Sequence, residues 1–88
     1  MNPIKKLYKD LSNEELILLV KEIQVSDETG VFPIQSLVRD MCRKSAEITG
    51  MDTASNLLMT QINICKEAAI RWVVVEEDHF LEMKYIKY

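Results

Sequence analysis

Apolar residues recur along most of the chain at the three- and four-residue spacing of an amphipathic helix, which predicts an all-α fold. Residues 3–10 are expected to form a short helical turn, because Pro3 suits the first turn of a helix. Residues 13–25 are expected to form a firmer helix, since Ser12 and Glu15 match a capping box. The apolar face of that helix comprises Leu16, Ile17, Leu18, Leu19, Val20 and Ile23.

The stretch SDETGVFP is the clearest predicted loop, because Gly30 and Pro33 interrupt the helical spacing. The next helix is predicted over residues 34–49, and Gly50 is typical of a C-terminal cap. Asp52 then offers an N-cap for a third long helix. The apolar stripe predicted for the helix over 34–49 comprises Ile34, Leu37, Val38, Met41, Cys42 and Ile48.

The third long helix, predicted over residues 53–78, carries apolar side chains around most of its circumference. A helix of this kind is buried on several sides, and two shorter companions can hardly cover it alone. We therefore expect a small helical domain with one long apolar C-terminal helix that assembles into a compact helical oligomer. Its apolar residues are Leu57, Leu58, Met59, Ile62, Ile64, Cys65, Ala68, Ala69, Ile70, Trp72, Val73, Val74 and Val75.

Two alternatives stay open near the C-terminus. The β-branched run Val73–Val75 weakens helix propensity, so a switch to a strand is possible there. The segment 79–88 fits a helix end, because Tyr85 and Tyr88 are three residues apart. It also fits a short strand, because apolar residues alternate in part of it.

Length and composition indicate one domain, residues 1–88, with few chain-breaking residues. The net charge is −3 and the isoelectric point is near 5.1, which argues against binding to double-stranded nucleic acid. The longest apolar run, Leu16–Val20, is far too short to cross a membrane. We find no apolar signal-peptide core, and we expect a cytoplasmic protein that does not bind membranes.

Residues suited to catalysis or metal binding are sparse. Cys42 and Cys65 lie in apolar helical patterns and are expected to be buried free thiols in a reducing compartment. Neither has a zinc-like spacing to His79, and the acidic run 76–78 is typical of a solvated helix end. The chain has no glycine-rich phosphate loop. We therefore expect neither an enzyme, nor a metal site, nor a cofactor.

The basic N-terminus carries the one candidate binding cluster. Lys5, Lys6 and Lys9 surround Tyr8, although the chain as a whole is acidic. An aromatic ring can stack on a nucleobase, and a lysine can hold a phosphate. The alternative is that Tyr8 packs on neighbouring leucines and that the lysines only keep this end soluble.

The stretch LYKDLSNEEL, followed by VKEI, resembles the N-terminal motif of the small phage anti-CBASS proteins that act as cyclic-nucleotide sponges. The resemblance covers residues 7–23. It implies an all-helical homohexamer in the host bacterial cytoplasm that sequesters cyclic dinucleotides, such as cyclic GMP-AMP, without cleaving them. It further implies that Tyr8 stacks on a base and that Lys21 meets a phosphate.

The spacing of the implied contacts restricts this picture. Tyr8 and Lys21 are thirteen residues apart, so on one continuous helix they would lie roughly 140° apart. Either the chain bends at Ser12 or the two side chains come from different subunits. Some relatives use an Arg and a Thr one helical turn apart for cyclic trinucleotides, but here Arg71 is eleven residues from Thr60.

A different class of function also fits the sequence. A small phage regulator or antitoxin could bind a host protein through the wide apolar face of residues 57–75. A closed oligomer would favour the sponge, and a monomer that exposes this face would favour the host target.

Overall fold

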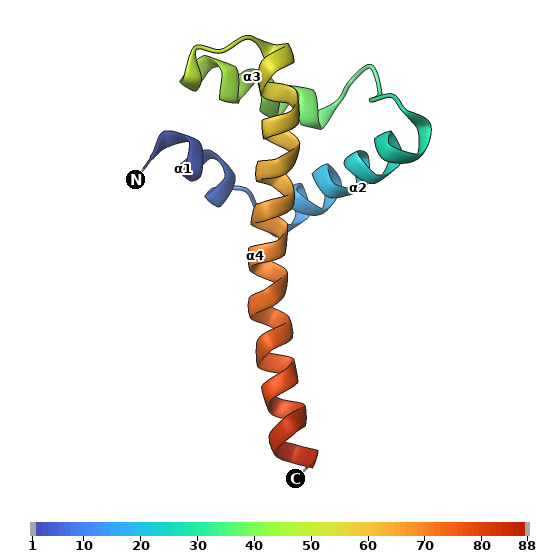
Figure 1. Cartoon of the computed structure of the whole chain (residues 1–88), viewed down its shortest axis with the longest axis vertical. Helices are drawn as coiled ribbons and strands as arrows, with labels where there is room; N and C mark the ends of the chain where they lie inside the picture. Colours follow the sequence, from blue (N-terminus) through green and yellow to red (C-terminus); the bar gives the residue numbers. More distant parts are fainter. Residues whose placement is uncertain (1, 88) are drawn as a thin grey trace.

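The computed structural model describes the backbone of residues 2–87 and the side chains of residues 2–72. The chain forms α1 (Pro3–Lys9), α2 (Asn13–Thr29), α3 (Leu37–Thr49) and α4 (Thr53–Lys87), which confirms the predicted all-α class. Figure 1 shows α1 and α2 on either side of α4 and α3 across its N-terminal part. The C-terminal half of α4 projects beyond the other three helices. None of the described helices is long and apolar enough to span a membrane.

The capping box at the start of α2 is confirmed. The Ser12 hydroxyl accepts a hydrogen bond from Glu15 N at 3.1 Å, and Ser12 N donates to Glu15 Oε1 at 2.9 Å. This box satisfies two backbone donors that a helix start leaves unpaired. The helix continues to Thr29, four residues past the predicted end, and stops at Gly30 with φ of 80°.

The start of α3 differs from the prediction. Ser36 is the N-cap, and its hydroxyl accepts from Arg39 N at 3.0 Å, so the helix begins at Leu37. Ile34 therefore lies in the preceding loop, where it is 97% exposed, and its predicted place on the apolar stripe is wrong. Gly50, with φ of 75°, ends α3 as expected.

The core lies where α1, α2 and α3 meet the N-terminal half of α4. Burying one large apolar side chain contributes about 1.5–3 kcal/mol to the free energy of unfolding. This small set is therefore the main source of stability in the monomer. The buried cluster comprises Tyr8, Leu16, Leu19, Val38, Met41 and Ile64.

The prediction of a long apolar helix that is buried on several sides is wrong for the described side chains of α4. The row of α4 that packs against the body is Asn56, Thr60, Ile64 and Glu67, and only one of these is apolar. The other helices cover one side of α4, so most of the apolar residues among its described side chains, up to Trp72, remain in solvent. Large exposed side chains on α4 are Leu58, Met59, Ile62, Ile70 and Trp72.

The helical backbone of α4 continues through Lys87, so the strand alternatives for Val73–Val75 and for the tail are wrong. The predicted end at residue 78 is nine residues short. The roles expected for the acidic run 76–78 and for His79 depend on side chains outside the described residues, as does any role of Tyr88.

Candidate functional site

Tyr8 lies inside the monomer. Its side chain is 4% exposed, and its hydroxyl is 2.8 Å from the hydroxyl of Ser45 on α3. Leu7 and Leu11 pack against the same core cluster, as the structural alternative for Tyr8 expected. In this conformation Tyr8 offers no ring face to a ligand, so stacking on a base would require a different placement of α1.

Lys5 and Lys9 are exposed, while the Tyr8 ring between them points inward. The Lys9 ammonium lies 3.2 Å from Glu67 Oε2, and the Lys6 ammonium lies 2.6 Å from Asp10 Oδ2. The structure therefore does not form the predicted aromatic plate with free cations around it. Of the lysines in this cluster, Lys9 contributes to holding α1 on α4.

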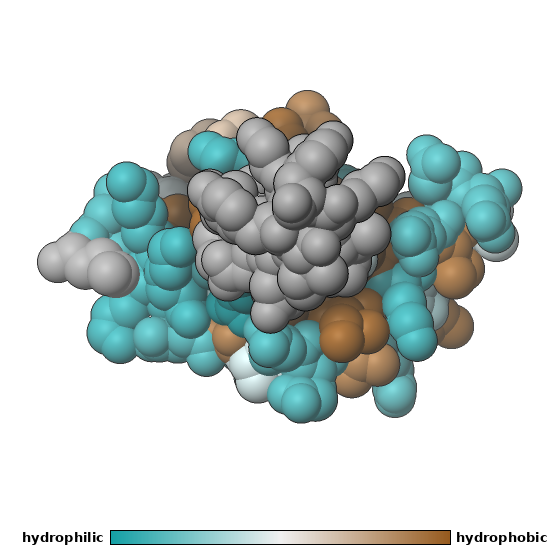
Figure 2. Space-filling model, turned by 90° about the horizontal axis from the view of Figure 1, so that it is seen from below, coloured by the Kyte–Doolittle hydropathy of each residue, from teal (hydrophilic) through white to brown (hydrophobic). Residues whose placement is uncertain are grey.

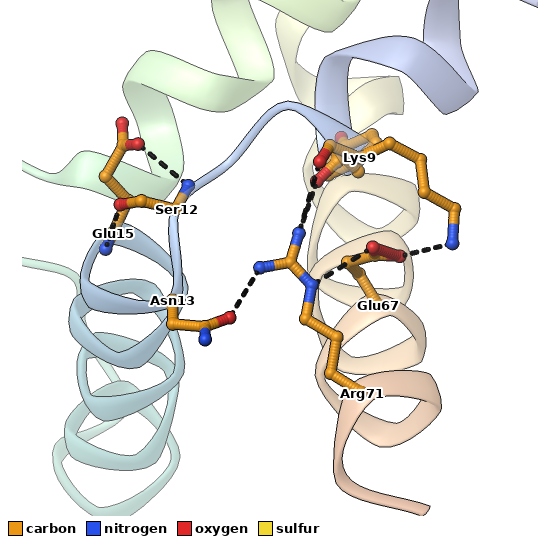
Figure 3. A network of polar contacts seen from close by, with 7 residues as sticks. Lys9, Ser12, Asn13, Glu15, Glu67 and Arg71 are labelled. Atoms are coloured by element: carbon orange, nitrogen blue, oxygen red, sulfur yellow. Dashed lines mark hydrogen bonds and ion pairs between the residues drawn. The ribbon is translucent and has the colours of Figure 1, made fainter. Parts of the chain in front are cut away.

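Arg71 closes the junction between α1 and α2 (Figure 3). Its Nη2 donates to the backbone carbonyls of Tyr8 and Lys9 at 3.3 and 3.4 Å, and its Nη1 donates to Asn13 Oδ1 at 2.9 Å. Its Nε donates to Glu67 Oε1 at 3.2 Å. Because the last carbonyls of a helix lack intrahelical partners, this guanidinium acts as a cap for α1.

Glu22, within the VKEI stretch, has an architectural role. Its carboxylate accepts hydrogen bonds from Leu37 N at 2.8 Å, from Val38 N at 3.1 Å and from the Ser36 hydroxyl. A carboxylate at a helix N-terminus satisfies unpaired donors and complements the helix dipole. Part of the motif that carries the resemblance is thus explained here by the packing of α2 on α3.

Lys21 lies in a different place from Tyr8. It is exposed on α2 and lines a groove of about 630 Å³ between α2 and α4, and Tyr8 does not line this groove. The volume falls within the usual range of small-molecule sites, roughly 300–1,000 Å³. The lining residues are Asn13, Leu16, Ile17, Val20, Lys21, Gln24, Ala68, Ala69, Arg71 and Trp72.

The groove combines an apolar floor with a cationic and aromatic rim. Ala68 and Ala69 are small, which leaves room between the two helices. Trp72, 65% exposed, offers a large ring, and Lys21 and Arg71 supply positive charge. Figure 2 shows hydrophobic residues at the surface on the α2 side of α4, whereas the α1 side is mainly hydrophilic.

The resemblance assigned Lys21 to a ligand, but the sequence analysis did not single out Trp72 or Arg71 as residues of the same groove. A signal was available, because the pair Ala68–Ala69 stands directly before Arg71 and Trp72 on one helix. Small residues allow a helix to lie close to a neighbouring helix, and a cation and an aromatic ring one turn further on can contact a ligand between the two. The partner helix could not be identified from this local pattern.

The two cysteines differ in their surroundings. Cys42 is a buried free thiol, as predicted, and its Sγ donates to Thr53 O at 3.1 Å. Cys65 is free but exposed, so its predicted burial is wrong, because it faces away from the body on α4. Among the residues with described side chains, no group of three or more His, Cys, Asp or Glu could hold a metal ion.

Thr60 and Arg71 are the residue types that some relatives use for cyclic trinucleotides. Here Thr60 is 1% exposed in the core, while Arg71 donates a hydrogen bond to the Tyr8 carbonyl at the end of α1. The two side chains therefore lie in separate environments. A comparison with known protein families, curated proteins and solved structures finds no match for this chain.

Proposed function

We propose that this protein is a non-catalytic binder that sequesters cyclic dinucleotides in the α2–α4 groove and thereby blocks CBASS defence in the cytoplasm of a host bacterium. The observation that carries the proposal is the placement of Trp72 and Lys21 at one apolar groove. An aromatic ring, a nearby cation and an apolar floor suit a flat base joined to a phosphate.

The chemical groups of a cyclic dinucleotide suit the residues that line the groove. A cyclic dinucleotide carries two aromatic bases and two phosphates on one compact ring. Stacking of one base on Trp72 would contribute roughly 1–3 kcal/mol to binding. Lys21 would meet a phosphate as a point charge. Arg71 is 26% exposed and already bound to Glu67 and Asn13, so its main role is to hold the ends of α1 and α2 on α4.

The resemblance of residues 7–23 supports the same ligand class and the same lysine. It does not support the same aromatic residue, because Tyr8 is in the core. In the proposed site Trp72 takes the part that the resemblance assigned to Tyr8. Lys5 and Lys9 would act only through long-range attraction of an anionic ligand.

The proposal is tested by thermal unfolding in the presence of cyclic GMP-AMP and related cyclic dinucleotides. A ligand at 100 times its dissociation constant adds about 2.7 kcal/mol to the free energy of unfolding. We expect a clear rise in the melting temperature for the wild type. We expect little or none for Trp72→Ala and a reduced rise for Lys21→Ala.

Lys44→Ala is the matched control, because Lys44 is an exposed lysine on α3 outside the groove. It should retain the full shift. Chromatography of ligand released by denaturation should return intact cyclic dinucleotide. No shift with any cyclic dinucleotide, or recovery of a linear product, would contradict the proposal.

A second candidate function is a phage regulator or antitoxin that binds a host protein. It is favoured by three neighbouring apolar side chains on α4, Leu58, Met59 and Ile62, which are 65%, 50% and 41% exposed. Exposed apolar groups gathered on one helix mark an interaction surface. A monomeric protein that binds no nucleotide would favour this second function.

A further inference from the structure

A second hollow adjoins the candidate groove near the C-terminal end of α2. Its volume is about 500 Å³, and Gln24 lines both the groove and this hollow, so the two spaces are neighbours. We refer to it as the second hollow. Its lining residues, most of them polar, are Ile23, Gln24, Ser26, Asp27, Gly30 and Gln61.

The second hollow offers hydrogen-bond acceptors. Leu16, Val20 and Asp27 follow one another at intervals of four and seven, so Asp27 lies on the face of α2 that lines the groove. None of the ion pairs among the described side chains involves Asp27. Gln61 Nε2 donates to Leu57 O at 3.3 Å, which leaves Gln61 Oε1 as a further acceptor. An ionised carboxylate only accepts hydrogen bonds, so a ligand in the second hollow has to supply donors.

The groove offers the opposite chemistry. The Lys21 ammonium can only donate hydrogen bonds. Asn13 Oδ1 accepts from Arg71 Nη1 at 2.9 Å, so the amide nitrogen of Asn13 remains to donate to a ligand. Among the described residues, those that line the groove include no carboxylate. The combined space therefore suits a ligand that brings an acceptor-rich phosphate to the groove and a donor-bearing base to the second hollow.

We propose that the second hollow is a guanine subsite, in which the Asp27 carboxylate accepts hydrogen bonds from N1–H and N2–H of the base. This inference rests on the proposed function. Of the two purines, only guanine carries neighbouring N1–H and N2–H donors on one edge, and the two oxygens of a carboxylate match them. The Gln24 amide can donate to guanine O6. Adenine turns a ring-nitrogen lone pair to the same carboxylate, so Asp27 also acts against the wrong base.

The dimensions of the combined space suit this ligand. Lys21 and Asp27 are six residues apart on α2, about 9 Å along the helix axis, which one nucleotide can span from its phosphate to its base edge. Trp72 and Gln61 are eleven residues apart on α4, about 16 Å, so they lie at opposite ends of the space. With one guanine at Asp27 and a phosphate at Lys21, the second base is left for Trp72.

Calorimetric titration of the full chain with cyclic di-GMP, cyclic di-IMP and cyclic di-AMP tests the subsite. Hypoxanthine keeps N1–H and O6 of guanine but lacks the N2 amine. We expect the wild type to bind cyclic di-GMP about 10- to 100-fold more tightly than cyclic di-AMP, with cyclic di-IMP between them. Asp27→Asn replaces one acceptor with a donor, which suits adenine. It should therefore weaken the binding of cyclic di-GMP and strengthen that of cyclic di-AMP.

Glu28→Gln is the matched control, because it removes the same charge at the adjacent exposed position, which lines neither space. It should keep the wild-type order of affinities, and both variants should keep the wild-type circular dichroism. Equal binding of the three ligands by the wild type would overturn the guanine subsite and leave the proposed function standing. An Asp27→Asn variant with the wild-type order of affinities would do the same. Binding of no cyclic dinucleotide would overturn the proposed function and the subsite together.

Discussion

The hydroxyl of Tyr8 lies 2.8 Å from the hydroxyl of Ser45, and this buried hydrogen bond joins α1 to α3. Because the two hydroxyl groups bond to each other, both can be buried without an unpaired polar atom. The ring belongs to the same core cluster as Leu16 and Ile64. The residue that sequence reasoning proposed as a ligand contact thus has a clear structural role in the monomer.

Tyr8→Phe should lower the free energy of unfolding by about 1–2 kcal/mol, because it leaves the Ser45 hydroxyl buried without its partner. Tyr8→Ala should cost about 3–5 kcal/mol, since it also leaves a cavity. Urea unfolding, with an unchanged denaturant slope, measures both. Tyr8→Phe should leave cyclic dinucleotide binding unaltered. A Tyr8→Phe protein of full stability that binds no ligand would show that the hydroxyl acts at the ligand instead.

Arg71 should matter more to stability than Lys9, although both contact Glu67. Arg71→Met removes the bonds to the carbonyls of Tyr8 and Lys9 as well as those to Glu67 and Asn13, and should cost about 2–3 kcal/mol. Lys9→Met removes one ion pair whose lysine is 48% exposed, and should cost under about 1 kcal/mol. Chemical unfolding of the two variants side by side gives the comparison. Equal costs would mean that the Arg71 contacts to α1 contribute little.

Thr60 should tolerate loss of its hydroxyl. Its Oγ1 is buried and has no hydrogen-bond partner within the described residues. Thr60→Val keeps the branched shape and removes the unpaired polar group, so we expect a gain of about 1 kcal/mol. Thr49→Val is the control, because the Thr49 hydroxyl donates to Ser45 O at 3.0 Å. Thr49→Val should lower the melting temperature, whereas Thr60→Val should raise it. A lower melting temperature for Thr60→Val would show that the Thr60 hydroxyl has a hydrogen-bond partner.

Features encoded in neighbouring residues could be predicted from the sequence. The capping box at Ser12, the left-handed Gly50 and the N-cap at Asp52, whose Oδ1 accepts from Ser55 N at 2.7 Å, each depend on residues within one helical turn. The start of α3 was placed too early, because the apolar Ile34 extended the stripe past the true cap at Ser36.

Contacts between distant segments could not be predicted in the same way. Tyr8 and Ser45 are 37 residues apart, and Arg71 reaches carbonyls 62 and 63 residues away. The face of α4 that packs against α1, α2 and α3 could not be predicted either, because apolar residues lie on several sides of this helix. For the same reason Trp72 could not be recognised as the neighbour of Lys21 in the groove. The ligand role of Lys21 came only from the resemblance of residues 7–23 and stays a prediction.

Glu22 should contribute to stability through α3. Glu22→Ala removes the acceptor for Leu37 N, Val38 N and the Ser36 hydroxyl, and should cost about 1–2 kcal/mol. Glu28→Ala is the matched control, because Glu28 is exposed near the C-terminal end of α2, where a negative charge opposes the helix dipole. Its stability should be unchanged or slightly higher. Equal losses in the two variants, measured by urea unfolding, would argue against a capping role for Glu22.

Acid should weaken the starts of α2 and α4 in a predictable direction. Hydrogen bonds from the Ser12 backbone and side chain lower the pKa of Glu15 below its ordinary value of 4.5, and bonds from Ser55 lower the pKa of Asp52 below 3.8. A carboxyl whose pKa is lower in the folded state stabilises the protein above its unfolded-state pKa, and this stability is lost as the pH falls through the folded-state pKa.

Glu15→Gln keeps a side-chain acceptor in the capping box but cannot ionise. We therefore expect its stability to be below that of the wild type at pH 7 and to approach it as the pH falls from 5 to 2. Urea midpoints across this range measure the difference, with Glu14→Gln, at the exposed neighbouring position, as the control. Parallel curves for wild type and Glu15→Gln would mean that the charge of Glu15 adds nothing to the capping box.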